Sequence, residues 1–158
     1  MTEPLAADGR GNLLLDLRPG PESVLSDLRP VAPLPLSLVV ALCDDECLLV
    51  FNRWRQEWEL PGGMLEAGER AREAAAREFT EETGQPAPEL EFFGTALFRL
   101  APDDRLEHAA LFLARLDVLQ EFSPTDEIAE LRLWDPATEI TGLAPLDAYI
   151  VRSLTSHG

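Results

Sequence analysis

The sequence predicts an α/β (α+β) fold in which a mixed β-sheet is covered by helices. Several short apolar runs are separated by polar, proline-containing or glycine-containing segments, a pattern typical of strands. Two segments have the spacing of helices, one at 70–83, ending at Gly84, and one at 145–154. Strands and helices in this mixture assemble most naturally as a sheet with helices packed on it.

The predicted strands are six short segments that follow residue 35. In order, they span 36–42, 47–51, 58–60, 92–100, 109–116 and 128–134. The first two form a hairpin that turns at residues 44–46, and the third is stopped by the Pro-Gly-Gly sequence at 61–63. A polar loop at 102–107 separates the fourth strand from the fifth.

Residues 1–35 carry six prolines and are predicted to form an extended or loosely docked arm, because proline removes ladder donors and breaks helices. Within this arm, 13–17 is expected to form one short strand, packed on the body or on a second subunit. The chain of 158 residues then divides into a proline-rich arm at 1–35 and one domain at 36–158. Since the arm is long for a segment with no core of its own, a homodimer is the expected assembly.

The formal net charge of −16 limits the classes of partner. A protein this acidic repels a nucleic-acid backbone, so long DNA or RNA is disfavoured, whereas a small phosphate compound carried in with metal is not. The N-terminus has no basic region followed by an apolar core, and the apolar runs fall well short of the roughly 18 residues that a membrane span needs. We therefore expect a cytoplasmic protein without a membrane partner.

The two cysteines, Cys43 and Cys47, flank the predicted hairpin turn. Two thiols with His108 as the one histidine away from the chain end make a poor zinc site. They are interpreted as reduced strand residues.

Three glutamates of the first predicted helix lie on one face of it. With Glu78 at 0° on a helical wheel, Glu82 falls at about 40° and Glu81 at about 300°. Small apolar residues share this arc, namely Ala71, Ala74 and Ala75, while the polar arc holds Glu73, Arg77 and Thr80. Like charges at this spacing repel, and burying them without a partner is costly. A divalent cation resolves both problems, because carboxylate oxygens are the ligands that magnesium prefers.

The same residues closely resemble the Nudix box, the signature of Nudix hydrolases. The match is Gly63-x5-Glu69-x7-Arg77-Glu78-Phe79-x-Glu81-Glu82-x-Gly84, preceded by WELPGG at 58–63. It covers 23 of the 158 residues, 63–85. Phe79 and Gln85 stand where aliphatic residues are expected, and both are packing positions. The order of strands and the last helix also resemble the family fold, an α/β/α sandwich around a mixed sheet.

The resemblance implies a role for each residue of the box. Glu78, Glu81 and Glu82 would bind Mg²⁺, with Mn²⁺ as a substitute, together with the carbonyl of Gly62 or Gly63. Arg77 would orient this cluster by pairing with Glu69.

The general base is implied less directly. In this family it is either a box glutamate, here Glu78, or an acid from a later loop. Glu127 is the candidate from the loop before the last strand, with Asp126 and Glu107 behind it.

The implied reaction is Mg²⁺-dependent hydrolysis of a diphosphate bond in a nucleoside diphosphate-linked or nucleoside polyphosphate substrate. Residues outside the box would choose the rest of the substrate, because aromatic rings stack on bases and arginines bind phosphates. The candidates are Arg53, Trp54, Arg55, Phe98, Arg99 and Arg105. Pro102 lies near a position where members that cleave ADP-ribose often carry proline, which is a weak hint toward that substrate.

Two alternatives to a hydrolase stay open. One is a non-hydrolytic enzyme on the same scaffold, similar to isopentenyl diphosphate isomerase, which would need a catalytic cysteine. The other is a ligand-sensing or interaction module with a decayed site, which should lack the costly carboxylates.

Overall fold

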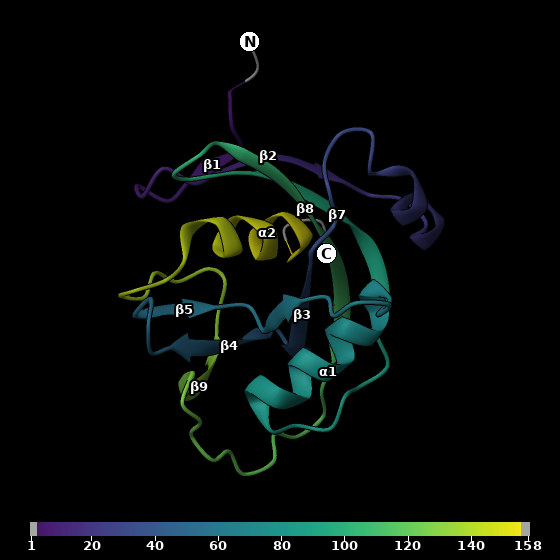
Figure 1. Ribbon diagram of the computed structural model, residues 1–158. Helices are drawn as coiled ribbons and strands as arrows, with labels where there is room; N and C mark the ends of the chain where they lie inside the picture. The colour runs from purple at the N-terminus through teal and green to yellow at the C-terminus, as the bar shows by residue number, and fades with distance from the viewer. Residues whose placement is uncertain (1–2, 156–158) are drawn as a thin grey trace.

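The computed structural model describes residues 3–155, which form a strongly curved mixed sheet with one helix on each face (Figure 1). Along the sheet the strands follow the order β1 (Ala6–Ala7), β2 (Leu13–Arg18), β7 (Glu91–Leu100), β8 (Arg105–Arg115), β3 (Leu36–Cys43), β4 (Glu46–Asn52) and β5 (Glu57–Glu59). Two more strands join it from the side, β6 (Gly62–Met64) on β3 and β9 (Ile128–Trp134) on β4. The helices are η1 (Glu22–Asp27), α1 (Ala71–Thr83) and α2 (Pro145–Thr155).

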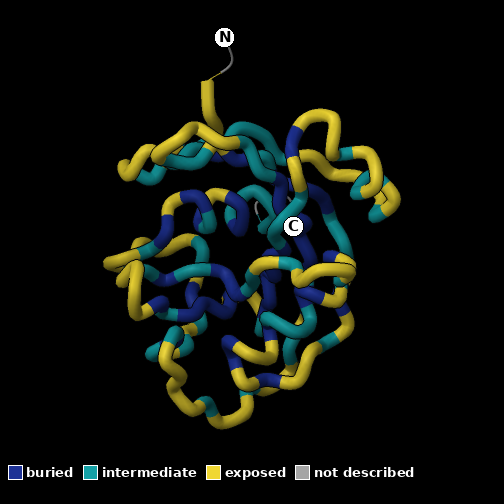
Figure 2. Tube along the Cα trace, in the orientation of Figure 1, coloured by how far each residue is buried: buried dark blue, intermediate teal, exposed yellow. Residues whose placement is uncertain are grey.

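Strand β3 is central because its side chains alternate between two hydrophobic clusters. Leu38, Val40 and Leu42 face the cluster that includes the buried side of α2. Val39 and Ala41 face the other cluster, which includes the buried side of α1. Figure 2 shows buried residues concentrated in these central strands, with exposed residues in the surrounding loops. The expected arrangement of helices on both faces of a mixed sheet is confirmed.

Along one edge, β3 pairs with two different strands, and this arrangement makes room there for the glycine segment that forms β6. β3 pairs with β4 only at Leu42↔Cys47 and Cys43↔Glu46. At its other end, β3 pairs with β6 through Leu36↔Met64, Ser37↔Gly63 and Leu38↔Gly62. On its opposite edge it runs parallel to β8 along its length. The glycine segment before α1 therefore lies directly against the central strand.

Most predicted elements are present with boundaries shifted by a few residues. The differences have simple causes. Gly62 and Gly63 form β6 instead of ending the sheet, because residues without Cβ atoms can approach β3 closely. The polar loop expected at 102–107 is shorter, since β8 begins at Arg105 and the turn is confined to 101–104.

The N-terminal arm forms part of the sheet of its own chain. The strand expected at 13–17 is present as β2, and it pairs antiparallel with β7 from Leu13↔Arg99 to Arg18↔Thr95. Leu14 is fully buried in the cluster that contains α2. The division of the chain at residue 35 and the homodimer stay predictions. Within residues 3–155, no helix is long and apolar enough to cross a membrane.

Two positions that depart from the aliphatic pattern of the box are both buried. Phe79 has no exposed surface and belongs to the cluster under α1. Gln85 is 2% exposed. Its amide nitrogen donates to the carbonyls of Thr83 and Gln120, and its amide oxygen accepts from the Gln120 backbone N–H at 2.7 Å. Gln85 thus replaces an apolar contact by hydrogen bonds that fasten the segment leading to β9.

Replacing Gln85 by Leu is expected to lower the free energy of unfolding by about 1–2 kcal/mol, although Leu is the more apolar side chain. The substitution removes the partner of the buried Thr83 carbonyl and of the part-buried backbone groups of Gln120, and a buried group left without a partner costs about 1–3 kcal/mol. Urea unfolding of the variant measures the difference. Gln120→Ala is the control and should be silent, because only the backbone of Gln120 takes part. A Gln85→Leu protein as stable as the unmodified chain would contradict this role.

Candidate active site

The glycine segment, strand β3 and helix α1 meet at one point. The Gly62 backbone N–H donates to Glu82 Oε1 at 2.8 Å, joining the segment to the last turn of α1. A Cβ atom at Gly62 would collide with the Ser37 carbonyl of β3, and one at Gly63 would collide with the carboxylate of Glu78. Glycine is therefore required at Gly62, where backbone atoms leave no room for a side chain, whereas a side chain at Gly63 would displace the carboxylate of Glu78.

Helix α1 is held in register with this segment at both ends. Ser37 Oγ, buried in β3, donates to the Ala71 carbonyl at 2.7 Å in the first turn. The helix ends at Gly84, whose φ of 68° lies in the left-handed region and whose N–H bonds to the Thr80 carbonyl. These anchors fix which side chains of α1 face the sheet.

Three carboxylates gather where α1 meets the loop before β9. Glu78, Glu82 and Glu127 all line one pocket. Burial and the nearby charges of Glu127 and Glu78 raise the pKa of Glu82 to about 9. Burial also raises the pKa of Glu78, although the Arg77 guanidinium opposes this shift. Placing negative charge on all three groups is therefore unfavourable without a proton or a cation between them.

Arg77 neutralises the other side of the cluster. Its guanidinium binds Glu69 with two nitrogens, at 2.9 and 3.0 Å, and donates to Glu78 Oε1 at 2.8 Å. It also reaches Glu81 Oε2 at 3.2 Å and the Met64 carbonyl at 2.9 Å. These contacts hold the pKa of Glu69 at about 2, chiefly through the hydrogen bonds from Arg77. The predicted Arg77–Glu69 pair is present, and it ties α1 to the loop in front of it.

The pocket of about 500 Å³ has an acidic end and is otherwise lined by both apolar and polar side chains. The acidic end is formed by Glu78, Glu82 and Glu127 beside the backbone of Gly62 and Gly63. The apolar side chains that line it are Leu36, Leu38, Leu60, Met64, Phe98, Leu100 and Leu146. The remaining lining residues are Asp8, Asn12, Arg55, Glu59 and Asp147. Such a pocket suits a ligand that has apolar surface and an anionic group bound through a cation at the carboxylates.

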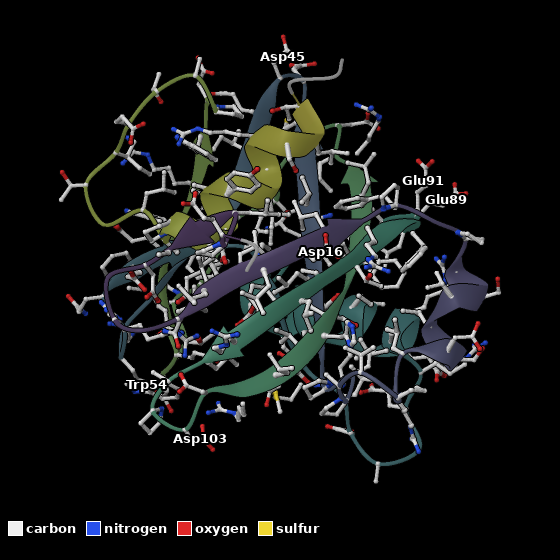
Figure 3. All side chains as sticks on the ribbon, turned by 90° about the horizontal axis from the view of Figure 1, so that it is seen from above. Asp16, Asp45, Trp54, Glu89, Glu91 and Asp103 are labelled. Carbon is white, nitrogen blue, oxygen red and sulfur yellow. The ribbon has the colours of Figure 1, made fainter. Side chains whose placement is uncertain are left out.

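Among the predicted substrate contacts, only Arg55 and Phe98 line this pocket. Arg55 binds Glu59 through two nitrogens, at 2.5 and 2.9 Å. Trp54 is 71% exposed and points outward from the β4–β5 turn, as Figure 3 shows. Arg53 donates to the Thr125 carbonyl, and so tethers the loop that carries Glu127. Arg105 is paired with Asp103 and Glu107, outside the pocket. The role of Arg99 as a contact stays a prediction.

The other predicted acidic residues differ in how close they lie to the pocket. Glu81 has a side chain 56% exposed and lies at the outer edge of the cluster, next to Arg77. Asp126 is exposed and does not line the pocket, and neither does Glu107. Of the three loop acids, only Glu127 comes to Glu78 and Glu82. The roles of these residues in metal binding and catalysis stay predictions.

Asp147 is a pocket residue that the sequence analysis missed. It lies in the first turn of α2 and its Oδ2 accepts the Leu60 backbone N–H at 2.8 Å, while its Oδ1 accepts no hydrogen bond from residues 3–155. Burial raises its pKa to about 7. A signal was present, because Asp147 falls at about 100° on a wheel where Leu146, Ile150 and Val151 span about 0° to 140°. An acid in the middle of an apolar arc is costly unless it has a specific role.

A divalent cation fits the acidic end of the pocket. Within residues 3–155, no three acidic, histidine or cysteine side chains form a ready ligand set. The donor chemistry nevertheless matches a hard cation, because Glu78 and Glu82 are carboxylates beside a bare glycine backbone. Their raised pKa values mark a place where added positive charge stabilises the ionised forms.

Comparisons with known proteins agree with this geometry. A family model described as the NUDIX domain matches residues 33–154. An RNA pyrophosphohydrolase from Cereibacter sphaeroides is 51% identical over 39 residues, and the match spans only about a quarter of each protein, 25% of this chain and 24% of the relative. A Bacillus subtilis pyrophosphohydrolase structure superposes with a TM-score of 0.71 at 21% identity, covering 95% of this chain and 91% of that one. A C. elegans Ap4A hydrolase superposes with a TM-score of 0.63 at 19% identity, covering 80% and 97%.

Replacing Asp147 by Asn is expected to make the protein relatively more stable as the pH rises. The folded pKa of about 7 lies above the unfolded value, so the contribution of Asp147 to stability is fully present below about pH 4 and is lost as the pH rises through 7. Asn keeps an acceptor for the Leu60 N–H and carries no charge. Urea unfolding at pH 5 and pH 8 should show the variant gaining about 1–3 kcal/mol on the unmodified protein between the two pH values. Parallel pH profiles would contradict the burial of this acid.

Proposed function

Because the chain belongs to the Nudix family, we propose that it is a pyrophosphohydrolase, one that uses Mg²⁺ to cleave the diphosphate bond of a small nucleotide. The substrate class is a nucleoside diphosphate linked to another group, or a nucleoside polyphosphate. The observation that carries this proposal is the meeting of Glu78, Glu82 and Glu127 in a pocket that is also lined by apolar side chains. Mn²⁺ has the same ligand preference and should substitute.

Glu78 and Glu82 are the central ligands in this proposal, with the carbonyl of Gly62 or Gly63 beside them and Glu81 at the outer edge. When bound, the cation supplies positive charge that neutralises the diphosphate and makes an attacking water molecule more acidic. Arg77 keeps Glu78 in place through its hydrogen bond at 2.8 Å, while Glu69 holds Arg77 from the other side.

Glu127 is the proposed general base. It lines the pocket beside Glu82, and it comes from a loop separate from α1. Its carboxylate takes the proton of the water that attacks phosphorus. The bond between that phosphorus and the bridging oxygen then breaks, and each product keeps a terminal phosphate. Glu78 is the other candidate for this proton transfer, and it is already engaged by Arg77.

The apolar side chains that line the pocket are proposed to hold the nucleoside. Phe98, Leu100 and Leu146 supply apolar surface for a base. The free carboxylate oxygen of Asp147 can accept an N–H group from the edge of that base. Arg55 is the one cation that lines the pocket, and it can contact a second anionic group.

A second candidate function is removal of pyrophosphate from the 5′ end of RNA. The 39-residue match to an RNA pyrophosphohydrolase and the similarity in fold to the Bacillus subtilis pyrophosphohydrolase favour it. The net charge of −16 opposes it, because a polynucleotide needs basic side chains along its path. A small nucleotide is therefore the preferred substrate class.

The isomerase alternative is not favoured by the positions of the cysteines. Cys47 is fully buried in the sheet, and burial raises its pKa to about 12, so it stays a protonated thiol. Cys43 lies at the end of β3 near the Asp117 carbonyl. Neither of them lines the pocket that holds the carboxylates. The sensing alternative is disfavoured because the costly carboxylates are retained.

Replacing Glu82 by Gln should separate catalysis from folding. Gln keeps an acceptor for the Gly62 N–H, yet it loses the charge that binds the metal, so we expect turnover to fall about a hundredfold or more. The metal-free variant should be at least as stable as the unmodified protein, since a buried charge is removed. Millimolar Mg²⁺ should raise the Tm of the unmodified protein and not that of the variant.

Two matched variants complete this experiment. Glu127→Gln should lower kcat while keeping the Mg²⁺-induced shift in Tm, as expected of a base that is not a main ligand. Glu73→Gln lies on the polar side of α1, with a side chain 51% exposed, and should leave kcat and the shift unchanged. Equal activity of Glu82→Gln and Glu73→Gln would overturn the assignment of this helix face.

A substrate panel tests the proposed substrate class. We expect phosphate-containing products from nucleoside triphosphates, nucleoside diphosphate sugars, ADP-ribose or dinucleoside polyphosphates in the presence of Mg²⁺. A 5′-triphosphorylated RNA of about ten nucleotides should react with a kcat/KM at least about tenfold lower than that of the best small substrate, because of charge repulsion. A preference for the RNA would favour the second candidate, and no hydrolysis of any member would contradict both.

A further inference from the structure

The loop between β1 and β2, residues 8–12, forms one wall of the catalytic pocket. Asp8 and Asn12 line the pocket that also contains Glu78, Glu82 and Glu127. The matched family region begins at residue 33, so this wall comes from a part of the chain that the family pattern does not specify.

Hydrogen bonds give the loop a defined shape. The Asp8 carboxylate accepts from the backbone N–H groups of Arg10 and Asn12, at 2.8 and 3.1 Å, and from Asn12 Nδ2 at 2.7 Å. Gly9 and Gly11 have φ angles of 80° and 92°, values that residues other than glycine rarely adopt. Asn12 Oδ1 accepts from the Ala101 N–H at 2.9 Å, so the loop is fastened to the turn between β7 and β8.

Arg10 fastens the other side of the loop to the β4–β5 turn. Its Nη2 donates to the Arg55 carbonyl at 3.3 Å, and its Nη1 lies 3.5 Å from Glu57 Oε1. This turn carries Arg55, the cation that lines the pocket, and Arg55 is paired with Glu59. Three connecting segments therefore meet at one end of the molecule. They are the loop 8–12, the turn 53–56 and the turn 101–104. Figure 3 shows two of them by the labels Trp54 and Asp103, on the side away from Asp45.

We propose that the loop 8–12 is a specificity-determining wall and that Arg10 is its positioning residue. By holding the loop against the β4–β5 turn, Arg10 sets the width of the pocket opposite the carboxylates and keeps Arg55 directed at the bound ligand. The ligand class is a mononucleotide whose nucleoside lies on Phe98 and Leu100, enclosed on its outer side by Asp8 and Asn12. The identity of the ligand rests on the proposed function, whereas the position of the loop does not.

The contact of Arg10 can be broken without touching the carboxylates. Its side chain is 52% exposed, and exposed ion pairs contribute little to stability, so a substitution there should leave the Tm within a few degrees. Arg10→Glu places a negative charge next to Glu57 and pushes the loop from the turn. The expected result is a rise in KM of about tenfold for the best mononucleotide substrate, with kcat within about twofold. The double variant Arg10→Glu with Glu57→Arg restores opposite charges and should bring KM back to within about threefold.

Arg18→Glu is the matched control in the same hairpin. Arg18 pairs with Asp16 on an exposed surface, its side chain is 79% exposed, and it does not line the catalytic pocket. This variant should keep the KM of the unmodified protein. An equal rise in KM for Arg18→Glu would show a general loss of the hairpin and would overturn the proposed role of the loop. An unchanged KM for Arg10→Glu would also overturn it, and so would a KM that does not recover in the charge-swapped variant.

Binding measured without hydrolysis separates this inference from the proposed function. Calorimetry with a nucleotide in which a methylene group replaces the bridging oxygen, in the presence of Mg²⁺, gives the Kd directly. A Kd that rises about tenfold in Arg10→Glu and not in Arg18→Glu supports the wall even if the protein hydrolyses nothing. A Kd that is the same in all variants overturns the wall, even if the unmodified protein is an active pyrophosphohydrolase.

Discussion

The hydrogen bond from the Gly62 N–H to Glu82 joins the glycine segment, helix α1 and strand β3 at a single point. It forms only if the Gly62 backbone lies against Ser37 and if the last turn of α1 faces the sheet, and both conditions depend on the absence of a Cβ atom. Ser37 adds a second link, from the same strand to the first turn of α1. The positions of Glu78 and Glu82 follow from this packing.

The carboxylates of the cluster differ in how their charge is compensated. Glu69, Glu78 and Glu81 all contact Arg77, so the protein itself supplies positive charge on the outer side. Glu82 instead accepts a backbone N–H, and burial together with its acidic neighbours Glu127 and Glu78 raises its pKa to about 9. A positively charged ligand therefore stabilises the ionised carboxylates most when it lies between Glu82 and Glu127, on the side that faces the pocket.

The rest of the pocket is built by elements far from α1 in the sequence. Helix α2 contributes Asp147, the turn after β4 contributes Arg55, and the N-terminal hairpin contributes Asp8 and Asn12. Each of these is fixed by its own contacts, for example Asp147 by the Leu60 N–H and Asn12 by the Ala101 N–H. These supports lie outside residues 63–85, so segments that the box does not contain complete the pocket.

The sequence by itself determined the fold class, most of the strands to within a few residues, the two long helices and the face of α1 that carries Glu78 and Glu82. These properties depend on periodicity and on residues close together in the chain. The pairing of Arg77 with Glu69 was implied by the resemblance to the Nudix box, and it is present in the structure. Only the tertiary structure decided that Glu127 reaches Glu82, that Glu81 and Trp54 point outward, and that Asp147 and the loop 8–12 enclose the pocket. Those facts depend on contacts between segments as much as 89 residues apart, such as Asn12 and Ala101, and local spacing carries no information about which distant segments meet.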